Sequence, residues 1–325
     1  MNRILRSLAL IASAAALAVS SVPAAACSNP NALGVSRTLA VDARTMPLIG
    51  SHDYGVTLPL APGEVVLTFD DGPMSPYTEH VLRALAAECA RAVFFMVGRR
   101  ARANPQLAWQ VRAAGHTVGT HTQNHLLYRM PADLAAYEID TGIHSIAGAL
   151  GSHRAVAPFF RFPGLFRTPA GEHHLQMRGL MSWSVDADSY DWKRGSARHM
   201  LAHTLTELDK RRGGILLMHD VQPKTALVLP ALLGELKVRG YRLVHVVPKG
   251  TPVSQPPLST TVSPQHFKPE ELTSGATDLQ NRIAKPRFPA AAVPSSAAIE
   301  SPRTSPGGNG LFEAIFTASG HRWGR

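Results

Sequence analysis

Asp70 and Asp71 are two adjacent carboxylates that end an apolar run and stand directly before Gly72 and Pro73. The run, residues 65–69, is rich in β-favouring side chains and predicts a buried strand followed by a turn. In sheets and barrels of parallel strands, active sites lie where the carboxyl ends of the strands meet. Because successive side chains of an extended segment point in opposite directions, one aspartate could bind a metal ion while the other faces a substrate. The alternative is a turn that simply ends a strand.

A second polar segment, residues 119–125, contains His121 and His125 and follows a short predicted strand at 117–119. Histidines four positions apart lie on one face of a helical turn, so two imidazoles could reach one ion. With a carboxylate from a neighbouring strand end, they would form a set of two histidines and one acid that leaves a position open for water. Such a set is typical of a catalytic metal site, and two polar surface histidines are the alternative.

Three further segments carry side chains that could take part in chemistry at the same rim. His219 ends an apolar strand and could donate a proton to a leaving group. The acidic segment 186–192 follows another strand, and its Trp192 suits the apolar face of a sugar ring. The guanidinium of Arg161 could hold a carboxylate ionised. The alternatives are a hydrogen-bonded rim histidine, solvated turn acids and an arginine on a solvated loop.

The elements that must position these residues form an alternating pattern. Strands are predicted at 65–69, 92–97, 117–119, 180–185, 215–218 and 243–247, and helices at 78–90, 104–114, 133–150, 197–208 and 226–238. This alternation favours a parallel α/β architecture, and the short pieces suit an irregular barrel. We therefore expect one such domain over residues 64–248, preceded by an N-terminal arm at 27–63. Residues 249–325 are rich in Pro, Ser and Ala without apolar periodicity and predict a mostly disordered tail.

Residues 1–26 have the features of a secretory signal peptide. Arg3 and Arg6 precede an uncharged apolar stretch at 8–19, and three alanines at 24–26 supply a small-residue cleavage pattern. The apolar stretch is short for a membrane span, although a retained anchor is the alternative. We expect an exported protein, periplasmic or secreted, without a transmembrane span after cleavage.

The chain has two cysteines, Cys27 and Cys89. In an exported protein they could form a disulfide between the N-terminal arm and the core. Cleavage near Ala26 would also leave Cys27 near the new amino terminus, where lipidation would consume its sulfur and exclude that disulfide. Two cysteines are too few for a thiolate zinc site.

The composition of the 325-residue chain is 45% hydrophobic, enough to build a substantial core in one large domain or two smaller ones. The formal net charge is +10, but no long basic run is interleaved with aromatic residues. The sequence therefore argues against a nucleic-acid partner and favours affinity for an anionic cell-envelope polymer. It leaves the oligomeric state open.

Five segments, taken in order, resemble the motifs of the polysaccharide deacetylases, which are the NodB-homology proteins of carbohydrate esterase family four. They are residues 68–72, 121–125, Arg161 with Pro163, 188–192 and 217–219. The resemblance spans about residues 64–247. It implies a distorted (β/α) barrel and the metal-dependent removal of N- or O-acetyl groups from an acetylated glycan such as chitin oligomers or peptidoglycan.

The resemblance also implies a role for each matched residue. Asp71, His121 and His125 would bind the metal, usually zinc and sometimes cobalt or another divalent ion. Asp70 would be the general base and His219 the general acid. Further matched residues would orient Asp70 and His219 or line the pocket for the acetyl methyl group, namely Arg161, Asp191, Trp192 and Leu217.

One position departs from the family pattern. The family usually follows Arg-x-Pro with an aromatic residue, often Tyr, whose backbone N–H faces the oxyanion, whereas this chain has Gly164 followed by Leu165 and Phe166. A backbone donor survives this change, but the shape of the loop and the fit of the substrate differ. The alternative to a deacetylase is therefore a catalytically impaired barrel of the same fold that binds glycans.

Overall fold

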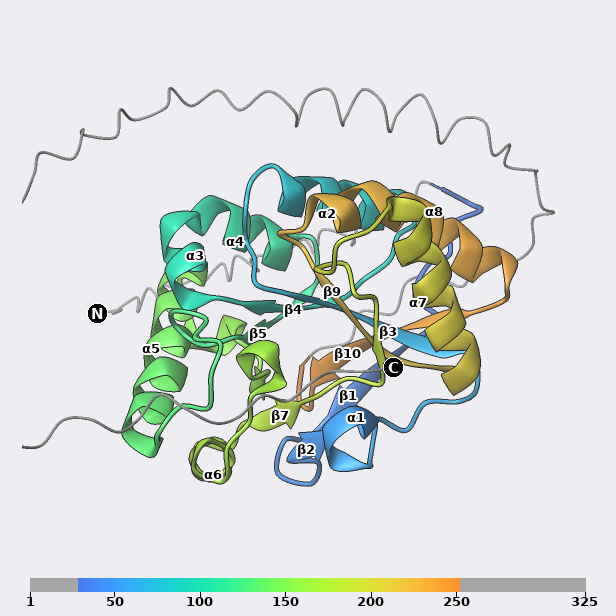
Figure 1. The fold of residues 1–325 in the computed structure, drawn as a ribbon. Coiled ribbons are helices and arrows are strands. Elements are labelled where there is room, and N and C mark those ends of the chain that lie inside the picture. The colour runs from blue at the N-terminus through green and yellow to red at the C-terminus, as the bar shows by residue number, and fades with distance from the viewer. Residues whose placement is uncertain (1–28, 252–325) are drawn as a thin grey trace, which may run out of the picture. The chain divides into compact units, whose positions relative to one another are not determined.

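The computed structural model describes residues 29–251, and Figure 1 shows how their strands and helices are arranged. The chain divides into two units, Met1–Ala276 and Thr277–Arg325, and every described residue belongs to the first. The predicted signal peptide, Cys27 and all but the first residues of the predicted tail lie outside the described residues. Within 29–251, no helix combines the length and apolar character that crossing a membrane requires.

Ten strands form one parallel sheet within the described residues. In chain order they are β1 (Arg37–Val41), β2 (Leu48–Ile49), β3 (Glu64–Asp70), β4 (Val93–Met96), β5 (Thr117–Thr120), β6 (Phe159–Phe160), β7 (Met181–Trp183), β8 (Ala187–Asp188), β9 (Gly213–His219) and β10 (Arg242–Pro248). The order in space is β1-β10-β3-β4-β5-β6-β7-β2, and β9 pairs with both β3 and β8. Residues 184–186 link β7 directly to β8, so the ring of strands returns to β3. The predicted distorted barrel is therefore confirmed.

Strand β3 is the centre of this arrangement, and all seven of its residues are buried. It pairs with β9 over its whole length, with β4 at its carboxyl half and with β10 at its amino end. Val65, Leu67 and Phe69 belong to the core between the sheet and the helices, whereas Val66 belongs to the core inside the barrel. Because side chains alternate along a strand, Asp70 shares the inward direction of Val66.

The helices cover the outside of the strands (Figure 1). They are α1 (Ser51–Tyr54), α2 (Tyr77–Ala87), α3 (Gly98–Ala103), α4 (Pro105–Ala113), α5 (Ala132–Leu150), α6 (Pro169–Met177), α7 (Ala197–Arg211) and α8 (Pro223–Val238), with 3-10 turns at His153–Ala155 and Pro163–Leu165. Local signals explain several starts: a proline occupies the first turn of α4, and the Ser196 hydroxyl caps α7 by accepting from His199 N. The five predicted helices are present. The short helices α1, α3 and α6 were not predicted, although α6 begins with a Thr168 N-cap followed by Pro169, which is a helix-start signal.

Two strands come from the segment that the sequence presents as an arm, residues 27–63. β1 pairs with β10 over five residues, and β2 pairs with β7. Arg37 of β1 also forms an ion pair of 2.7 Å with Glu64, the first residue of β3. Part of this segment is therefore integrated into the sheet. Strands of two to five residues are too short to give a readable hydrophobic period.

Candidate active site

The two adjacent aspartates at the end of β3 have separate surroundings. Asp70 is the last residue of the strand and is 2% exposed. Asp71 has a positive φ of 80°, so the extended backbone ends at this residue. The turn sends the Asp71 carboxylate toward His121 and His125, while Asp70 faces Arg161.

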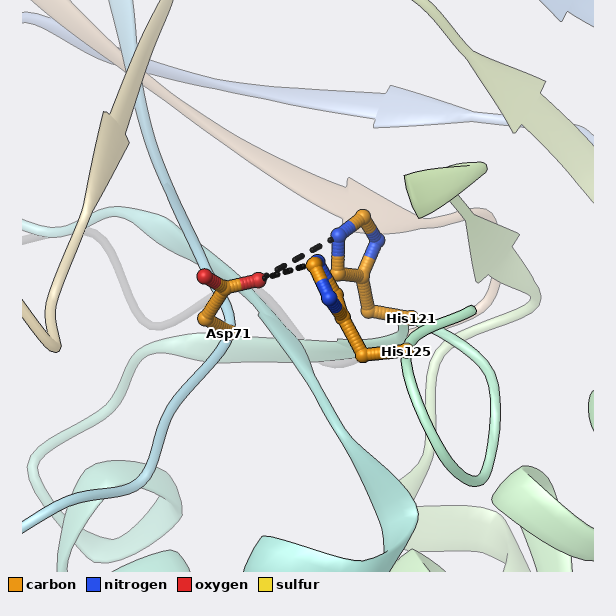
Figure 2. Close-up of side chains that lie close together, drawn as sticks. All are labelled: Asp71, His121 and His125. Carbon is orange, nitrogen blue, oxygen red and sulfur yellow. Dashed lines mark ion pairs between the residues drawn. The ribbon is translucent and has the colours of Figure 1, made fainter. Parts of the chain in front are cut away.

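Asp71, His121 and His125 are brought together as a group of potential metal ligands. One donor atom from each lies within 4.8 Å of the other two. Asp71 Oδ1 is 2.8 Å from His125 Nε2 and 3.5 Å from His121 Nε2, and both imidazoles point toward the carboxylate (Figure 2). Within the described residues, Asp71 Oδ1 is buried and makes no hydrogen bond of acceptable geometry. A buried carboxylate oxygen that faces two ring nitrogens fits a divalent cation, which would satisfy all three groups.

The expectation that the two histidines share a helical turn is wrong. Residues 121–131 form an irregular loop after β5, in which Thr122 and His125 both have positive φ values. The Glu138 carboxylate fixes this loop, because it accepts hydrogen bonds of 2.7 Å from both the backbone N and the side-chain Nδ2 of Asn124. The two imidazole rings still approach to 5.0 Å between centroids. Backbone turns, rather than helical periodicity, bring the two rings together.

The protonation states of the cluster suit metal binding. Burial lowers the pKa of His121 to about 4, against the opposing effect of Asp70 and Asp71. His121 Nδ1 lies 2.7 Å from the carbonyl oxygen of Arg161, which can only accept, so this nitrogen carries the proton and Nε2 is free to bind. Burial by itself would raise the pKa of Asp71, but the neighbouring histidines outweigh it and hold that pKa well below its usual range. A neutral imidazole and an ionised carboxylate are the forms that bind metal ions.

Arg161 is fully buried beneath Asp70. Its Nη1 donates hydrogen bonds of 2.8 Å to both Asp70 Oδ1 and the Thr68 hydroxyl, and its Nη2 donates to the carbonyl of Ser184. Its guanidinium also lies 4.3 Å from the centroid of the Phe95 ring. One oxygen of Asp70 is thereby fixed, and the other lies 3.8 Å from His121 Nε2. The interpretation of Arg161 as a residue on a solvated loop does not hold.

His219 and Asp191 form a second pair at the end of the neighbouring strand, in which Asp191 is buried and His219 is half-buried. His219 aligns with Asp70 in the β3–β9 register. Asp191 Oδ1 is 2.7 Å from His219 Nδ1, and Asp191 Oδ2 accepts from His219 N and from the Thr225 hydroxyl. Burial lowers the pKa of His219, but the charge and hydrogen bond of Asp191 outweigh it and raise that pKa to about 10. His219 is therefore a protonated imidazolium at neutral pH.

The remaining predicted site residues have different exposures. Leu217 is 5% exposed and lies on β9 two residues before His219, whereas Trp192 is 54% exposed and follows Asp191 in the loop after β8. Gly164 adopts φ 58°, ψ 15°, and a Cβ built there would lie 2.9 Å from the Phe166 ring. The loop of the altered third motif therefore packs Phe166 where a side chain at position 164 would begin.

Sequence reasoning assigned no structural role to three buried acids that organise these loops, although one of them, Asp186, stands in the acidic segment 186–192. Asp220 accepts a 2.9 Å hydrogen bond from Gly72 N and a 2.6 Å bond from the Thr78 hydroxyl. Asp186 accepts from Ser51 and Ile215, and Glu138 holds the histidine loop. Asp220 stands next to His219 in the sequence, and Glu138 interrupts the apolar face of a helix. These were the available signals, but neither shows which backbone groups the acid contacts.

The fold and the side-chain cluster together define a class: an α/β barrel hydrolase with a metal-binding Asp-His-His set, an arginine-bound carboxylate and an aspartate-bound histidine. A sequence model described as polysaccharide deacetylase matches residues 58–181. A peptidoglycan-N-acetylglucosamine deacetylase of Bacillus cereus is 33% identical over 193 residues, which cover 56% of this chain and 85% of that protein. The chain belongs to the polysaccharide deacetylase family.

Two further comparisons agree with this assignment. A chitooligosaccharide deacetylase of Azorhizobium caulinodans is 32% identical over 192 residues, covering 57% of this chain and 86% of that protein. The solved structure of a peptidoglycan deacetylase from Bdellovibrio bacteriovorus is similar with a TM-score of 0.59 and 32% identity. That match covers 66% of this chain and 59% of the solved chain.

Proposed function

We propose that this chain is a zinc-dependent deacetylase that hydrolyses the N-acetyl group of N-acetylglucosamine units in a glycan polymer. The observation that carries the proposal is the placement of the Asp71-His121-His125 group beside Asp70 and His219. Two imidazoles and one carboxylate are the protein ligands of one common type of catalytic zinc site. The names of the Bacillus and Azorhizobium proteins favour an N-acetylglucosamine polymer as the substrate class.

Amide hydrolysis needs an activated water, an acceptor for its proton and a donor for the departing amine. A divalent ion held by Asp71, His121 and His125 would polarise the amide carbonyl and lower the pKa of a bound water to about 7. We assign Asp70 as the group that accepts a proton from the attacking water. Arg161 supports this role, because it fixes Asp70 Oδ1 and leaves Oδ2 on the side of His121, and the Thr68 hydroxyl accepts from the same guanidinium nitrogen.

His219 would supply the second proton. Its Nδ1 is bound to Asp191, so Nε2 is the nitrogen that can donate to the amide nitrogen as the C–N bond breaks. The products are acetate and the free amine of the sugar. We assign Asp191 as the residue that orients His219, and Leu217 and Trp192 as the walls of the acetyl pocket. The backbone N–H at Gly164 would donate to the oxyanion.

Acetate release from defined glycans tests this proposal. Residues 27–325 are purified, stripped of metal with a chelator and restored with zinc or cobalt. We expect acetate from N-acetylglucosamine oligomers or from peptidoglycan, none from acetylated xylan, and none from any substrate before metal is restored. Metal bound without acetate from any glycan would contradict the proposal and favour a glycan-binding barrel.

Two histidine variants distinguish the loss of a proposed metal ligand from the loss of a histidine elsewhere in the protein. His121→Ala should lose both bound zinc and acetate release, because it removes one of the three proposed ligands. His199→Ala is the matched control, since this histidine lies exposed on α7. Full zinc content in His121→Ala, measured by elemental analysis, would remove His121 from the ligand set.

We also propose that the protein is exported and acts on its polymer outside the cytoplasm. The support is the signal-peptide pattern of residues 1–26. The amino-terminal sequence of the mature protein recovered from the periplasm or medium tests this, and a chain that still begins at Met1 would contradict it.

A further inference from the structure

A pocket lies outside the candidate active site, at the amino end of β5. It has a volume of about 540 Å³, within the range of small-molecule binding sites. Thr117, the first residue of β5, lines the pocket, whereas His121 follows the other end of the same strand. The pocket is thus separated from His121 by the length of a four-residue strand, about 13 Å.

The walls of this pocket carry positively charged side chains, and no acidic side chain in the described lining neutralises them. Arg91, Arg112 and Arg154 all line it, and the described lining contains no Asp or Glu. Elsewhere in residues 29–251, arginines such as Arg37 and Arg239 pair with carboxylates. None of the three pocket arginines forms an ion pair within that range. We call this the arginine pocket.

The guanidinium of Arg91 lies close to the backbone at Gly115. Gly115 has a φ of 86°, and a Cβ built there would lie 3.0 Å from the central carbon of the Arg91 guanidinium. The absence of a side chain at this position lets the guanidinium lie against the turn between α4 and β5. Arg91 is half-buried, whereas Arg112 and Arg154 are exposed. One of the three guanidiniums therefore lies partly inside the wall, and the other two line the pocket from the protein surface.

Two buried histidines complete the polar lining. His116 Nδ1 accepts a hydrogen bond from Ala92 N, and His245 Nε2 lies 3.0 Å from the Thr117 hydroxyl. Burial lowers the pKa of His116 to about 3 and that of His245 to about 4, and the Arg91 charge acts in the same direction. Both rings are therefore neutral, and the charge of the pocket comes from the guanidiniums.

Trp109 gives the pocket a flat apolar edge. Its side chain is 58% exposed although it is a large aromatic group, and it lies on α4 one turn before Arg112. Residues three positions apart on a helix are neighbours on its surface. An indole ring beside a guanidinium can stack on the face of a sugar ring while the guanidinium binds an anionic substituent.

We propose that the arginine pocket binds a sugar ring that carries a phosphate or carboxylate group. Guanidiniums recognise both anions through paired N–H donors, so the two groups share one chemistry here. The site would bind an anionic glycan at a place distinct from the proposed deacetylase centre. The inference does not rest on the deacetylase proposal, because no proposed catalytic residue lines this pocket.

Calorimetric titration of residues 27–325 tests the proposal with four probes: glucose 6-phosphate, glucuronic acid, inorganic phosphate and glucose. We expect at least one of the two anionic sugars to bind more tightly than inorganic phosphate, and glucose not to bind. The anionic sugar that binds more tightly identifies phosphate or carboxylate as the preferred group. Affinity should fall as salt is raised, since exposed charges are screened. Equal binding of glucose and the anionic sugars would overturn the proposal.

A double variant, Arg112→Gln with Arg154→Gln, assigns the binding to this pocket. It should weaken the tightest probe at least tenfold, and both residues are exposed enough to replace without disturbing the core. The matched control is Arg102→Gln with Arg198→Gln, which removes two exposed arginines that do not line the pocket. Equal losses in the two double variants, or none in the first, would overturn the proposal. Unchanged thermal midpoints show that each variant is folded.

Two single variants complete the test. Trp109→Ala should weaken the anionic sugars at least threefold and leave inorganic phosphate unchanged, and an unchanged sugar affinity would overturn the role of the ring. His121→Ala, which disrupts the candidate metal site, should bind the anionic sugars normally. Loss of binding in that variant would place the anion at the metal site and overturn the assignment to the arginine pocket.

Discussion

Asp191→Asn is the change that examines the proposed proton donor most directly. The Asp191 carboxylate accepts hydrogen bonds from His219 Nδ1 and from His219 N. Replacing it with the amide of asparagine removes the negative charge and keeps the shape of the side chain. An asparagine must keep its oxygen toward His219 N and the Thr225 hydroxyl, because both donate to the same carboxylate oxygen. Its amide nitrogen would then face His219 Nδ1. A protonated Nδ1 would meet another donor, so the imidazolium form would lose its partner.

The magnitude follows from the pKa of His219. The rise from 6.5 to about 10 corresponds to about 5 kcal/mol in favour of the protonated ring. The charge and hydrogen bond of Asp191 are the largest contributions that raise it, with smaller ones from Asp71 and Asp70. Most of that preference should disappear in the variant. We expect turnover to fall about 10²- to 10⁴-fold, the range that a positioned general acid contributes.

The assay combines acetate release across pH with the titration of His219 followed by NMR. The pKa of His219 should fall, and the alkaline limb of the rate profile should move to lower pH, because the proton donor is lost earlier as pH rises. Asp133→Asn is the control, since it removes an exposed carboxylate in the first turn of α5 that makes no contact with His219 among the described hydrogen bonds and ion pairs. Turnover within threefold of the wild type would refute the assignment of His219 as the acid, and an unmoved pKa would refute the role of Asp191 in raising the pKa of His219.

Three further changes test other parts of the structure. Asp70→Asn should lower acetate release by at least 10²-fold with full zinc content, and loss of zinc would contradict the separate roles of the two aspartates. Glu64→Gln should cost about 1–3 kcal/mol in unfolding free energy at pH 7 through its bond to Arg37. Arg37 lowers the pKa of Glu64 to about 2, so chemical unfolding should show this difference shrinking as pH falls from 4.5 toward 2. Gly72→Ala should weaken zinc binding in a metal titration, because its Cβ would lie 2.0 Å from Asp220 Oδ2, and unchanged affinity would contradict this.

The sequence predicted the framework because the strands that carry the site are apolar and end in polar residues. Strand β3 and strand β9 were both recognisable from this contrast, and their parallel pairing places Asp70 opposite His219. The pairing of Arg161 with Asp70 came from the family resemblance, since a lone arginine after a short strand carries no such signal. Its complete burial could not be deduced from residue types.

What the sequence could not supply was the path of the loops. The spacing of His121 and His125 is compatible with a helical turn and with an irregular loop. The positive φ angles of Thr122 and His125 show that the segment is a loop. Such angles are uncommon for residues other than glycine and depend on contacts with distant groups. Glu138 provides one such contact from α5. Periodicity describes repeating structure and has no information on these turns.

The side chain of Asp220 links the carboxyl ends of β3 and β9 through hydrogen bonds. Its carboxylate accepts from Gly72 N, directly after the proposed metal ligand Asp71, while its own backbone follows His219. Burial raises the pKa of Asp220 to about 7, against the lowering by the Thr78 hydrogen bond, so the group is costly to ionise in this position. The hydrogen bonds of the Asp220 carboxyl group offset the free-energy cost of burying it. Asp220 ties the loop of the metal ligand to the strand of the proton donor, so the two proposed catalytic functions keep a fixed separation.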